Sequence, residues 1–386
     1  MTGPARRRAV TFLVTLSVLP MSGCSRTSTP SRSPDDLLSP SLSSVACISQ
    51  TSCIAVGVST TGSAFSELWD GRTWKALPTP GPPGSIPSKL EGVSCTSTTA
   101  CMAVGISGQS GTFQPLSESW NGTRWTIELP QEPTGSVIAS LSSVDCVSSE
   151  ACLATGAYQT AKPASVVGPL FESWDATRWA LLPGPSMTDW AALAGLSCTT
   201  ATACVLTANQ HLSNSFGALS WNGRDWASEA VASPSGVRIV QMTAITCRTS
   251  VCVAVGTWGK QFTANVRSLA ERWNGKRWSI LPTPADLNKQ LASVSCPTSK
   301  ACVAVGYAGP YVLAESWNGH RWLTTPAQSP GRNADLVGVS CVSATACMDV
   351  GSPAIEGALS EPLAEWWNGK RWSLTQAGVP PVGVNR

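Results

Sequence analysis

One pattern constrains the fold of this chain more than any other: a pair of cysteines recurs seven times along it. Successive first cysteines lie 48, 51, 52, 49, 49 and 45 residues apart, and each pair is followed by two tryptophans separated by four residues. A length of 386 residues would otherwise suggest two or three domains. A period of about 49 residues instead indicates one supersecondary unit that is copied seven times.

The seven copies contain nearly all of the cysteine and tryptophan, 14 of 15 Cys and 14 of 17 Trp. The cysteine pairs are Cys47 and Cys53, Cys95 and Cys101, Cys146 and Cys152, Cys198 and Cys204, Cys247 and Cys252, Cys296 and Cys302, and Cys341 and Cys347. The tryptophan pairs are Trp69 and Trp74, Trp120 and Trp125, Trp174 and Trp179, Trp221 and Trp226, Trp273 and Trp278, Trp317 and Trp322, and Trp367 and Trp372.

Each copy predicts four short β-strands, named A to D in chain order. The aligned copies read Val-Ser-Cys, a polar stretch, Cys-x-Ala-Val-Gly, a variable loop, Leu-x-Glu-x-Trp, Asn-Gly, Arg-Trp and a Pro-containing link. Short apolar runs bounded by Gly, Asn and Pro are typical of strands. Turns such as Asn121-Gly122 favour hairpins because both residues tolerate positive φ. Seven such units predict an all-β, seven-bladed propeller of four-stranded antiparallel blades.

The repeat also resembles known sequences. From about Leu42 to Leu374 it is similar to the repeat of Asp-box and photosystem-assembly-factor propellers, and Asp70-Gly71-Arg72-Thr73-Trp74 comes closest to their turn. It is similar as well to Cys-paired repeat lipoproteins of actinobacteria. The resemblance implies a propeller fold and says little about activity.

The first 24 residues are typical of a bacterial lipoprotein signal. Three arginines precede an apolar run of about 11 residues, which is too short for the ~20 residues of a membrane-crossing helix. Ser22-Gly23-Cys24 resembles the lipobox, although Met21 stands where Leu is usual, so Cys24 would be lipidated and begin the mature chain. An ordinary cleavable signal with Cys24 incidental is the alternative.

The signal defines the domain organisation that we expect. Residues 1–23 form the signal peptide, and residues 24–41 form a lipidated Ser/Thr/Pro-rich tether that cannot bury enough apolar surface to fold. Residues 42–386 form the propeller, with blades that start near 42, 90, 141, 193, 242, 291 and 336. Ring closure stays open at this level: residues 34–42 or the tail from Ser373 could complete a blade, or contacts between blades alone could close the ring.

Charge excludes one class of partner. Charged residues make up 13% of the chain, against a typical value of about 25%. Without the three arginines of the signal the balance is 23 basic against 23 acidic residues, a net charge of zero. A nucleic-acid binder needs a basic surface, so we expect no nucleic-acid partner.

The export signal decides how the 14 repeated cysteines are interpreted. In an oxidising compartment the seven pairs predict seven local disulfides across the A–B turns. Zinc is the competing interpretation, but five intervening residues is not the usual zinc spacing, and the chain has only two His. We therefore expect no metal. The pair of Cys247 and Cys252, one residue shorter, is where strain or a free pair is most expected.

Two further repeated positions carry polar groups. Glu precedes the first Trp by two residues in six blades, and Arg precedes the second Trp in five. We interpret them as structural Glu/Arg pairs, such as Glu271 with Arg277, rather than as a ring of binding carboxylates. Strand A carries small residues before its first cysteine, and only Asp145 among them is charged. A channel lined in this way is poor in reactive groups.

The aromatic residues outside the repeat point to a binding surface. Tyr158, Tyr307, Tyr311 and Trp258 fall in predicted B–C loops, and Trp190 falls in a D–A link, which places all five on one rim over blades 3 to 6. Aromatic rings there could stack on sugars or anchor a protein, with Asp189, His211, Lys260 and Arg267 nearby. The alternative is that they fold down and cover the core.

A search for catalytic groups finds no convergent set. Asp-box sialidases need an arginine cluster, a tyrosine nucleophile and an acid, and none can be matched here residue by residue. A two-carboxylate glycosidase could only use loop acids such as Asp189, Asp286 and Asp335. The chain has no Gly-x-Ser-x-Gly and no phosphate-binding loop.

We therefore expect a monomeric lipoprotein at the outer face of the cytoplasmic membrane, anchored there through Cys24. Its propeller would act as a binding or interaction module without a catalytic site or cofactor, and its partner would be a cell-wall glycan or a protein. One alternative is a sialidase-like glycan hydrolase or lyase that uses loop carboxylates. The second is a scaffold for an envelope protein complex.

Overall fold

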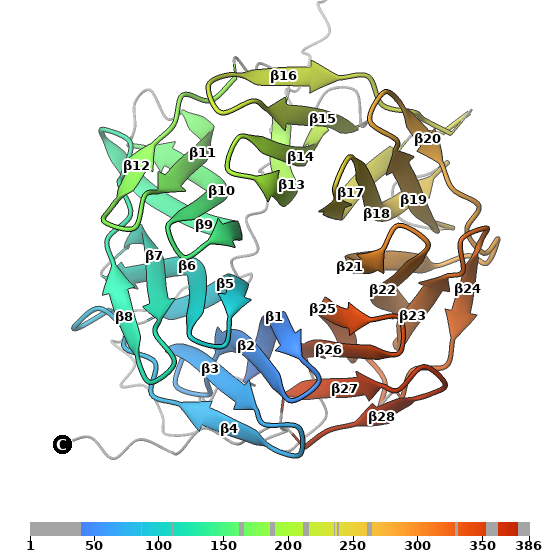
Figure 1. The fold of residues 1–386 in the computed structure, drawn as a ribbon. Helices are drawn as coiled ribbons and strands as arrows, with labels where there is room; N and C mark the ends of the chain where they lie inside the picture. Colours follow the sequence, from blue (N-terminus) through green and yellow to red (C-terminus); the bar gives the residue numbers. More distant parts are fainter. Residues whose placement is uncertain are drawn as a thin grey trace, which may run out of the picture. The chain divides into compact units, whose positions relative to one another are not determined.

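The computed structural model describes residues 40–376 except 86, 110, 162–165, 186–189, 211–215, 235, 238, 261–264, 329–330 and 353–361. Lipidation of Cys24, the signal peptide and the tether up to residue 39 therefore lie outside the described residues. Within residues 37–386 the described chain forms 28 strands, four from each repeat (Figure 1).

The strands of the first four repeats follow in chain order. Blade 1 contains β1 (Ser41–Ser49), β2 (Ser52–Val58), β3 (Ala64–Trp69) and β4 (Trp74–Leu77). Blade 2 contains β5 (Ser88–Ser97), β6 (Ala100–Gln109), β7 (Thr112–Trp120) and β8 (Trp125–Glu128). Blade 3 contains β9 (Ser136–Ser148), β10 (Ala151–Thr160), β11 (Val167–Trp174) and β12 (Trp179–Leu181). Blade 4 contains β13 (Trp190–Thr200), β14 (Ala203–Gln210), β15 (Phe216–Trp221) and β16 (Trp226–Glu229).

The last three repeats are built in the same way. Blade 5 contains β17 (Ile239–Arg248), β18 (Val251–Gly259), β19 (Arg267–Trp273) and β20 (Trp278–Ile280). Blade 6 contains β21 (Lys289–Thr298), β22 (Ala301–Ala308), β23 (Tyr311–Trp317) and β24 (Trp322–Thr325). Blade 7 contains β25 (Asp335–Ser343), β26 (Ala346–Ser352), β27 (Leu363–Trp367) and β28 (Trp372–Leu374).

Consecutive strands of each blade pair in antiparallel order, which confirms the predicted seven-bladed all-β propeller. Five blades are separate four-stranded sheets. Blades 2 and 3 form one eight-stranded sheet, because a single parallel bridge joins Phe113 of β7 to Ile138 of β9.

All seven predicted disulfides are present, and each joins strand A to strand B of one blade. In six blades the register places the two cysteines directly opposite each other, and the two Cα atoms of every pair are 3.9–4.0 Å apart. The short pair in blade 5 is bonded like the others, so the free pair considered there is wrong. The bonds join Cys47 to Cys53, Cys95 to Cys101, Cys146 to Cys152, Cys198 to Cys204, Cys247 to Cys252, Cys296 to Cys302, and Cys341 to Cys347.

The repeated glycine of strand B has a steric role. It faces the bulge in strand A, as Gly57 faces Leu42 in blade 1. A Cβ at Gly57 would overlap the carbonyl oxygen of Ser41, so a larger residue would force the two strands apart.

The core lies between blades. One cluster joins Ile54 and Val56 of blade 1 to Leu90 and Val93 of blade 2, together with the blade 2 tryptophans. In every blade the two repeated tryptophans are in contact, with ring centroids 5.1–5.9 Å apart. Burial of about 150–250 Å² per aromatic side chain makes these pairs a main source of cohesion between blades.

Contacts between blades close the ring. Strand β1 contacts β25 and β26, and Leu42 and Val45 share a core cluster with Met348 and Val350. The backbone N–H of Cys47 donates to Ser340 Oγ at 2.9 Å, and Trp74 Nε1 donates to Thr375 Oγ1 at 3.0 Å. Within the described residues β1 to β4 form blade 1 and β25 to β28 form blade 7, so these two blades share no strand.

Candidate functional site

Small residues of strand A make hydrogen bonds between neighbouring blades at four interfaces, those of blades 2 and 3, 4 and 5, 6 and 7, and 7 and 1. The hydroxyl of Ser94 accepts the N–H of Cys146, that of Ser197 accepts Cys247 N–H, and that of Ser295 accepts Cys341 N–H, at 3.0 Å in each case. Ser340 makes the same contact with Cys47. These hydroxyls therefore hold the inner strands together, and their chemistry is structural.

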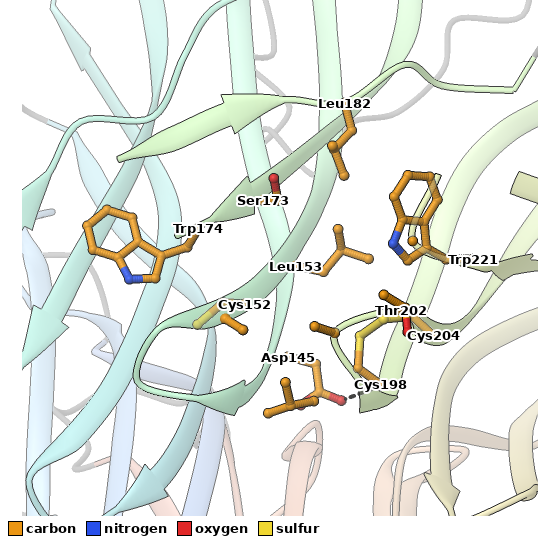
Figure 2. A pocket seen from close by; sticks show the side chains of 14 residues that line it. Asp145, Cys152, Leu153, Ser173, Trp174, Leu182, Cys198, Thr202, Cys204 and Trp221 are labelled. Carbon is orange, nitrogen blue, oxygen red and sulfur yellow. Dashed lines mark hydrogen bonds between the residues drawn. A yellow bond between two sulfur atoms is a disulfide. The ribbon is translucent and has the colours of Figure 1, made fainter. Parts of the chain in front are cut away.

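Asp145 takes the same place between blades 3 and 4. Its Oδ2 accepts the N–H of Cys198 at 2.7 Å, and its Oδ1 accepts the hydroxyl of Ser94 at 3.4 Å. Burial raises the pKa of this carboxyl to about 6, while the N–H of Cys198 opposes the shift. Among the strand A residues that precede the first cysteine it is the one acid, and it lies at the edge of a cavity (Figure 2).

The Glu/Arg pairing expected from the sequence is wrong. All six repeated glutamates have no exposed surface. The five arginines are exposed, because each occupies a C–D turn in which its backbone N–H bonds to the turn Asn or Asp. The two side chains therefore lie in different environments.

Three of the buried glutamates instead accept hydrogen bonds from the preceding blade. Glu172 Oε2 accepts the N–H of Gln131 at 2.8 Å, and Glu365 Oε1 accepts the N–H of Gln328 at 2.7 Å, where each glutamine belongs to the link that leaves the previous blade. Glu315 accepts the hydroxyl of Ser268 in blade 5 at 3.3 Å. Burial raises the pKa of Glu118 and Glu271 to about 8 and that of Glu172, Glu315 and Glu365 to about 7.

Two ionisable groups that sequence reasoning missed accompany these glutamates. Asp349 replaces the alanine of Cys-x-Ala-Val-Gly, is fully buried, faces Glu365, and accepts its N–H at 3.0 Å. Lys289 is buried, and its Nζ lies 2.7 Å from Asp286, 2.8 Å from Thr324 Oγ1 and 3.8 Å from Glu315. Alignment of the seven copies against one another carries a signal for both, since each breaks the pattern of its repeat.

The aromatic residues expected in loops lie in strands, so that expectation is wrong. Tyr158 belongs to β10, Trp258 to β18, Tyr307 to β22 and Tyr311 to β23, and Trp190 is the first residue of β13 rather than part of a link. Strands B and C continue their pairing beyond the apolar motif, through polar residues that carry no strand signal. Of Trp190 only the backbone is described, and Asp189 and His211 lie outside the described residues.

Tyr158 has a structural role. Its ring covers Gly168, the residue opposite it on β11, and it packs against the core between blades 2 and 3. This agrees with the alternative in which the aromatic residues cover the core, although the Tyr158 side chain is half-buried rather than fully buried.

Trp258, Arg267 and Tyr311 present a different surface at the B–C ends of blades 5 and 6. Arg267 lies opposite Trp258 in the sheet, and its guanidinium carbon is 5.5 Å from the centre of the indole ring. Both are half-buried, and Lys260 beside them is exposed. Tyr311 is 47% exposed. Tyr307 is half-buried, and its burial, together with the charge of Asp335, raises the pKa of its hydroxyl.

Backbone hydrogen bonds join these parts into one rim. The N–H of Asn288, in the link before blade 6, donates to Val266 O of blade 5, and Asn288 O accepts the N–H of Gly309 in the B–C turn of blade 6. The N–H of Asn333, in the link before blade 7, then donates to Pro310 O. We call the set Trp258, Lys260, Arg267, Tyr307, Tyr311 and Asp335 the aromatic rim.

Other kinds of site were sought in the part of the chain that is described. It contains no group of three His, Cys, Asp or Glu side chains able to hold a metal ion. Nor does it contain a helix that is long and apolar enough to cross a membrane.

Comparison with known proteins supports the fold. No protein-family model and no curated protein matches the chain. It is similar to the solved structure of YCF48 bound to D1 peptide (12% identity, TM-score 0.52), with 81% of this chain and 89% of that chain covered. It is also similar to YCF48 from Cyanidioschyzon merolae (12% identity, TM-score 0.51, 82% and 94% covered). At this identity the likeness concerns the propeller fold alone, in agreement with the resemblance to photosystem-assembly-factor propellers.

Proposed function

We propose that this chain is an exported, lipid-anchored propeller whose aromatic rim binds a protein segment at the outer face of the cytoplasmic membrane. The Trp258–Arg267 stack carries the proposal. An arginine that lies over an indole face holds its guanidinium donors in a fixed position, which suits a carboxylate. The same arginine covers one face of the ring on which a sugar would stack, so a protein segment is favoured over a glycan.

The surroundings of this stack suit the same ligand. Tyr311 offers an exposed aromatic ring, and aromatic and arginine side chains are the residues that most often anchor protein partners. Lys260, which is exposed, adds a second cation beside the half-buried Arg267. An extended segment with one acidic and one apolar side chain would satisfy both. The YCF48 propeller bound to D1 peptide is a precedent for a peptide on this fold.

Site-specific photocrosslinking in cells tests the proposal. A photoreactive phenylalanine at Tyr311 should yield an adduct with a protein, and Arg267→Gln in the same chain should reduce that adduct. The matched control carries the same group at Leu129, an 81% exposed residue after β8 of blade 2. Equal yields of the crosslinked adduct at both positions would contradict a protein partner at the rim. So would a yield at position 311 that Arg267→Gln does not change. Glycan binding lost in Trp258→Ala would replace it with a sugar ligand.

The lipid anchor is tested separately. Growth with an alkyne-bearing fatty acid should label the chain and leave it in the membrane fraction, whereas Cys24→Ala should lose both properties. A labelled Cys24→Ala chain, or an unlabelled native chain, would contradict anchoring through Cys24.

A further inference from the structure

The interface between blades 3 and 4 departs from the repeat at three positions. Asp145 stands where the other blades have Ala, Ser or Thr, and Phe171 stands where they have Ser or Ala. Leu219 replaces the buried glutamate. The Phe171 ring contacts Trp226 with centroids 5.0 Å apart, and Trp226 is half-buried whereas the second tryptophan of every other blade is buried.

The same interface contains a cavity of about 210 Å³. Its walls come from both blades: Leu153 and Leu182 belong to blade 3 and its outgoing link, while Trp221 and the Cys198–Cys204 disulfide belong to blade 4. Figure 2 shows Leu153 and Trp221 on facing sides and Asp145 at one end. Ala201, Thr202 and Gly223 also line the cavity and are exposed, so it opens at the rim of the A–B and C–D turns.

The volume and the lining of the cavity determine the size and the apolar character of a ligand that could fill it. A dry apolar cavity of about 150 Å³ can hold a benzene molecule, so this space admits a phenyl ring with a short chain attached. Leucine side chains, an indole ring and cystine sulfur supply the larger, apolar part of its lining, and polar groups such as Asp145, Ser173 and Thr202 supply the rest. It is thus built like other small-molecule sites, which are mostly apolar with a few fixed polar groups.

The polar end of the cavity, at Asp145, determines which polar group the ligand would carry. The Asp145 carboxylate accepts the N–H of Cys198 and the hydroxyl of Ser94, and hydrogen bonds from Ser197 and from the N–H of Cys146 also lower its pKa. All four donors are neutral, so an ammonium group would be the first positive charge at this carboxylate. The groups that face it are Ser94 of β5, Cys146 on its own strand and Ser197 and Cys198 of β13, none of which carries a charge. No cation among these residues neutralises the carboxylate.

We propose that the cavity between blades 3 and 4 binds a small primary ammonium compound, with its ammonium group on Asp145 and its apolar body between Leu153 and Trp221. This site lies on the turn side of the blades, away from the aromatic rim, and does not depend on the function proposed for that rim.

Calorimetric titration of the full chain with phenethylammonium chloride tests the site. Saturable binding at neutral pH is expected, and 2-phenylethanol, which has the same body without the charge, should bind at least ~10-fold more weakly. Asp145→Asn should remove this preference for the amine. Leu153→Phe should abolish binding of both probes by filling the cavity, whereas Met102→Phe, at the same position of blade 2, should leave binding intact.

A pH titration of amine binding uses only the native chain, so it tests the proposal even if a variant fails to fold. Protonation of Asp145 removes the charge that holds the amine, so affinity in the native chain should fall as pH drops from 7.5 to 5, while affinity for 2-phenylethanol stays constant. No saturable binding of phenethylammonium to the native chain would reduce the feature to a packing cavity. If the affinity for phenethylammonium changes neither in Leu153→Phe nor with pH, the amine binds elsewhere and the proposal is overturned.

Discussion

At the residue scale, the seven copies act as a comparison set within one molecule. Blade 4 has Leu219 in place of the buried glutamate, and the residue opposite it on the outer strand is Ser228. In blades 2, 3, 5 and 7 the order is reversed, with glutamate opposite Ile127, Leu181, Ile280 or Leu374. These pairs thus keep one apolar and one polar side chain.

Blade 6 shows what happens when both members are polar. Glu315 lies opposite Thr324, and the buried Lys289 contacts both side chains. A buried ammonium group is costly unless it is paired and hydrogen-bonded. Here Thr324 supplies that hydrogen bond and Asp286 lies 2.7 Å from the ammonium group, so the two substitutions, Lys289 and Thr324, form one network with the repeated Glu315.

A prediction at this scale concerns the C–D turn of blade 3. Ala176 has φ of 74° where other blades have glycine, as Gly122 has φ of 93°. An L-residue in this region is strained by about 1–2 kcal/mol. Ala176→Gly should stabilise the protein by about 0.5–1 kcal/mol, after the entropy cost of glycine, as measured by the urea midpoint. Gly122→Ala is the matched control and should destabilise the protein. If neither variant changes the urea midpoint, the turns carry no backbone strain.

At the element scale, repeated residues made the fold predictable. Four strands per copy, the hairpin turns and the disulfides each follow from residues that recur seven times. Strand length did not follow: β9 spans 13 residues and β10 spans 10, and both include polar positions. Pairing there depends on the neighbouring strand, so Tyr158 and Trp258 were predicted in loops although both belong to strands.

The candidate site was less predictable for a related reason. The sequence placed Trp258 and Arg267 near one rim, but their stacking depends on the register of β18 with β19, which the motif does not define. The cavity beside Asp145 depends on packing between two blades. Asp145 stood out in the sequence as the one acid of its set, yet nothing local indicated a space next to it.

A prediction at the element scale concerns the carboxyl pair of β26 and β27. Asp349 and Glu365 face each other and are fully buried, so burial and mutual repulsion raise the pKa of Asp349 well above its usual value. Asp349→Asn keeps the hydrogen-bonding shape without the charge. It should raise the melting temperature at pH 8 by about 2 °C or more and by a smaller amount at pH 5, because the cost of the raised pKa grows with pH above the ordinary value for Asp.

The same substitution at an exposed acid, Asp225→Asn, controls for net charge and should leave the melting temperature unchanged at both pH values. An equal effect of Asp349→Asn at pH 5 and pH 8 would mean that the pair does not hold a proton in the folded state.

At the scale of the whole molecule, ring closure is one interface among seven. The Ser340–Cys47 bond between blades 7 and 1 has the same geometry as the Ser94–Cys146 bond between blades 2 and 3. The closing interface has the same hydrogen bond as the interfaces of blades 2 and 3, 4 and 5, and 6 and 7, so the closure is not weaker than these three in this contact. Unfolding of the ring should therefore involve all blades together.

This equality can be measured. Ser340→Ala and Ser94→Ala should each lower the free energy of unfolding by about 1 kcal/mol, since each leaves a backbone N–H without its acceptor. Urea titrations followed by tryptophan fluorescence should show single transitions with matched midpoints. A silent Ser340→Ala beside a destabilising Ser94→Ala would indicate that another segment closes the ring.

The buried glutamates give the molecule a pH dependence with a definite sign. The pKa values of Glu118, Glu172, Glu271, Glu315 and Glu365 are about 7 to 8 in the folded state, against 4.5 for an ordinary glutamate. Between these values the folded chain binds more protons than the unfolded chain, so stability must fall as pH rises. Below pH 4.5 both states are protonated and these groups contribute no further change.

Between pH 5 and pH 8 the melting temperature should therefore decrease steadily, the reverse of a protein whose acids form ion pairs in the folded state. Calorimetric scans of the native chain across this range measure the decrease. The double variant Glu118→Gln, Glu271→Gln should show a shallower slope, because an amide replaces each of the two groups with the highest pKa values, about 8. A melting temperature that stays flat or rises between pH 5 and pH 8 would mean that the glutamates are ionised in the folded ring, and that each interface supplies a partner for their charge.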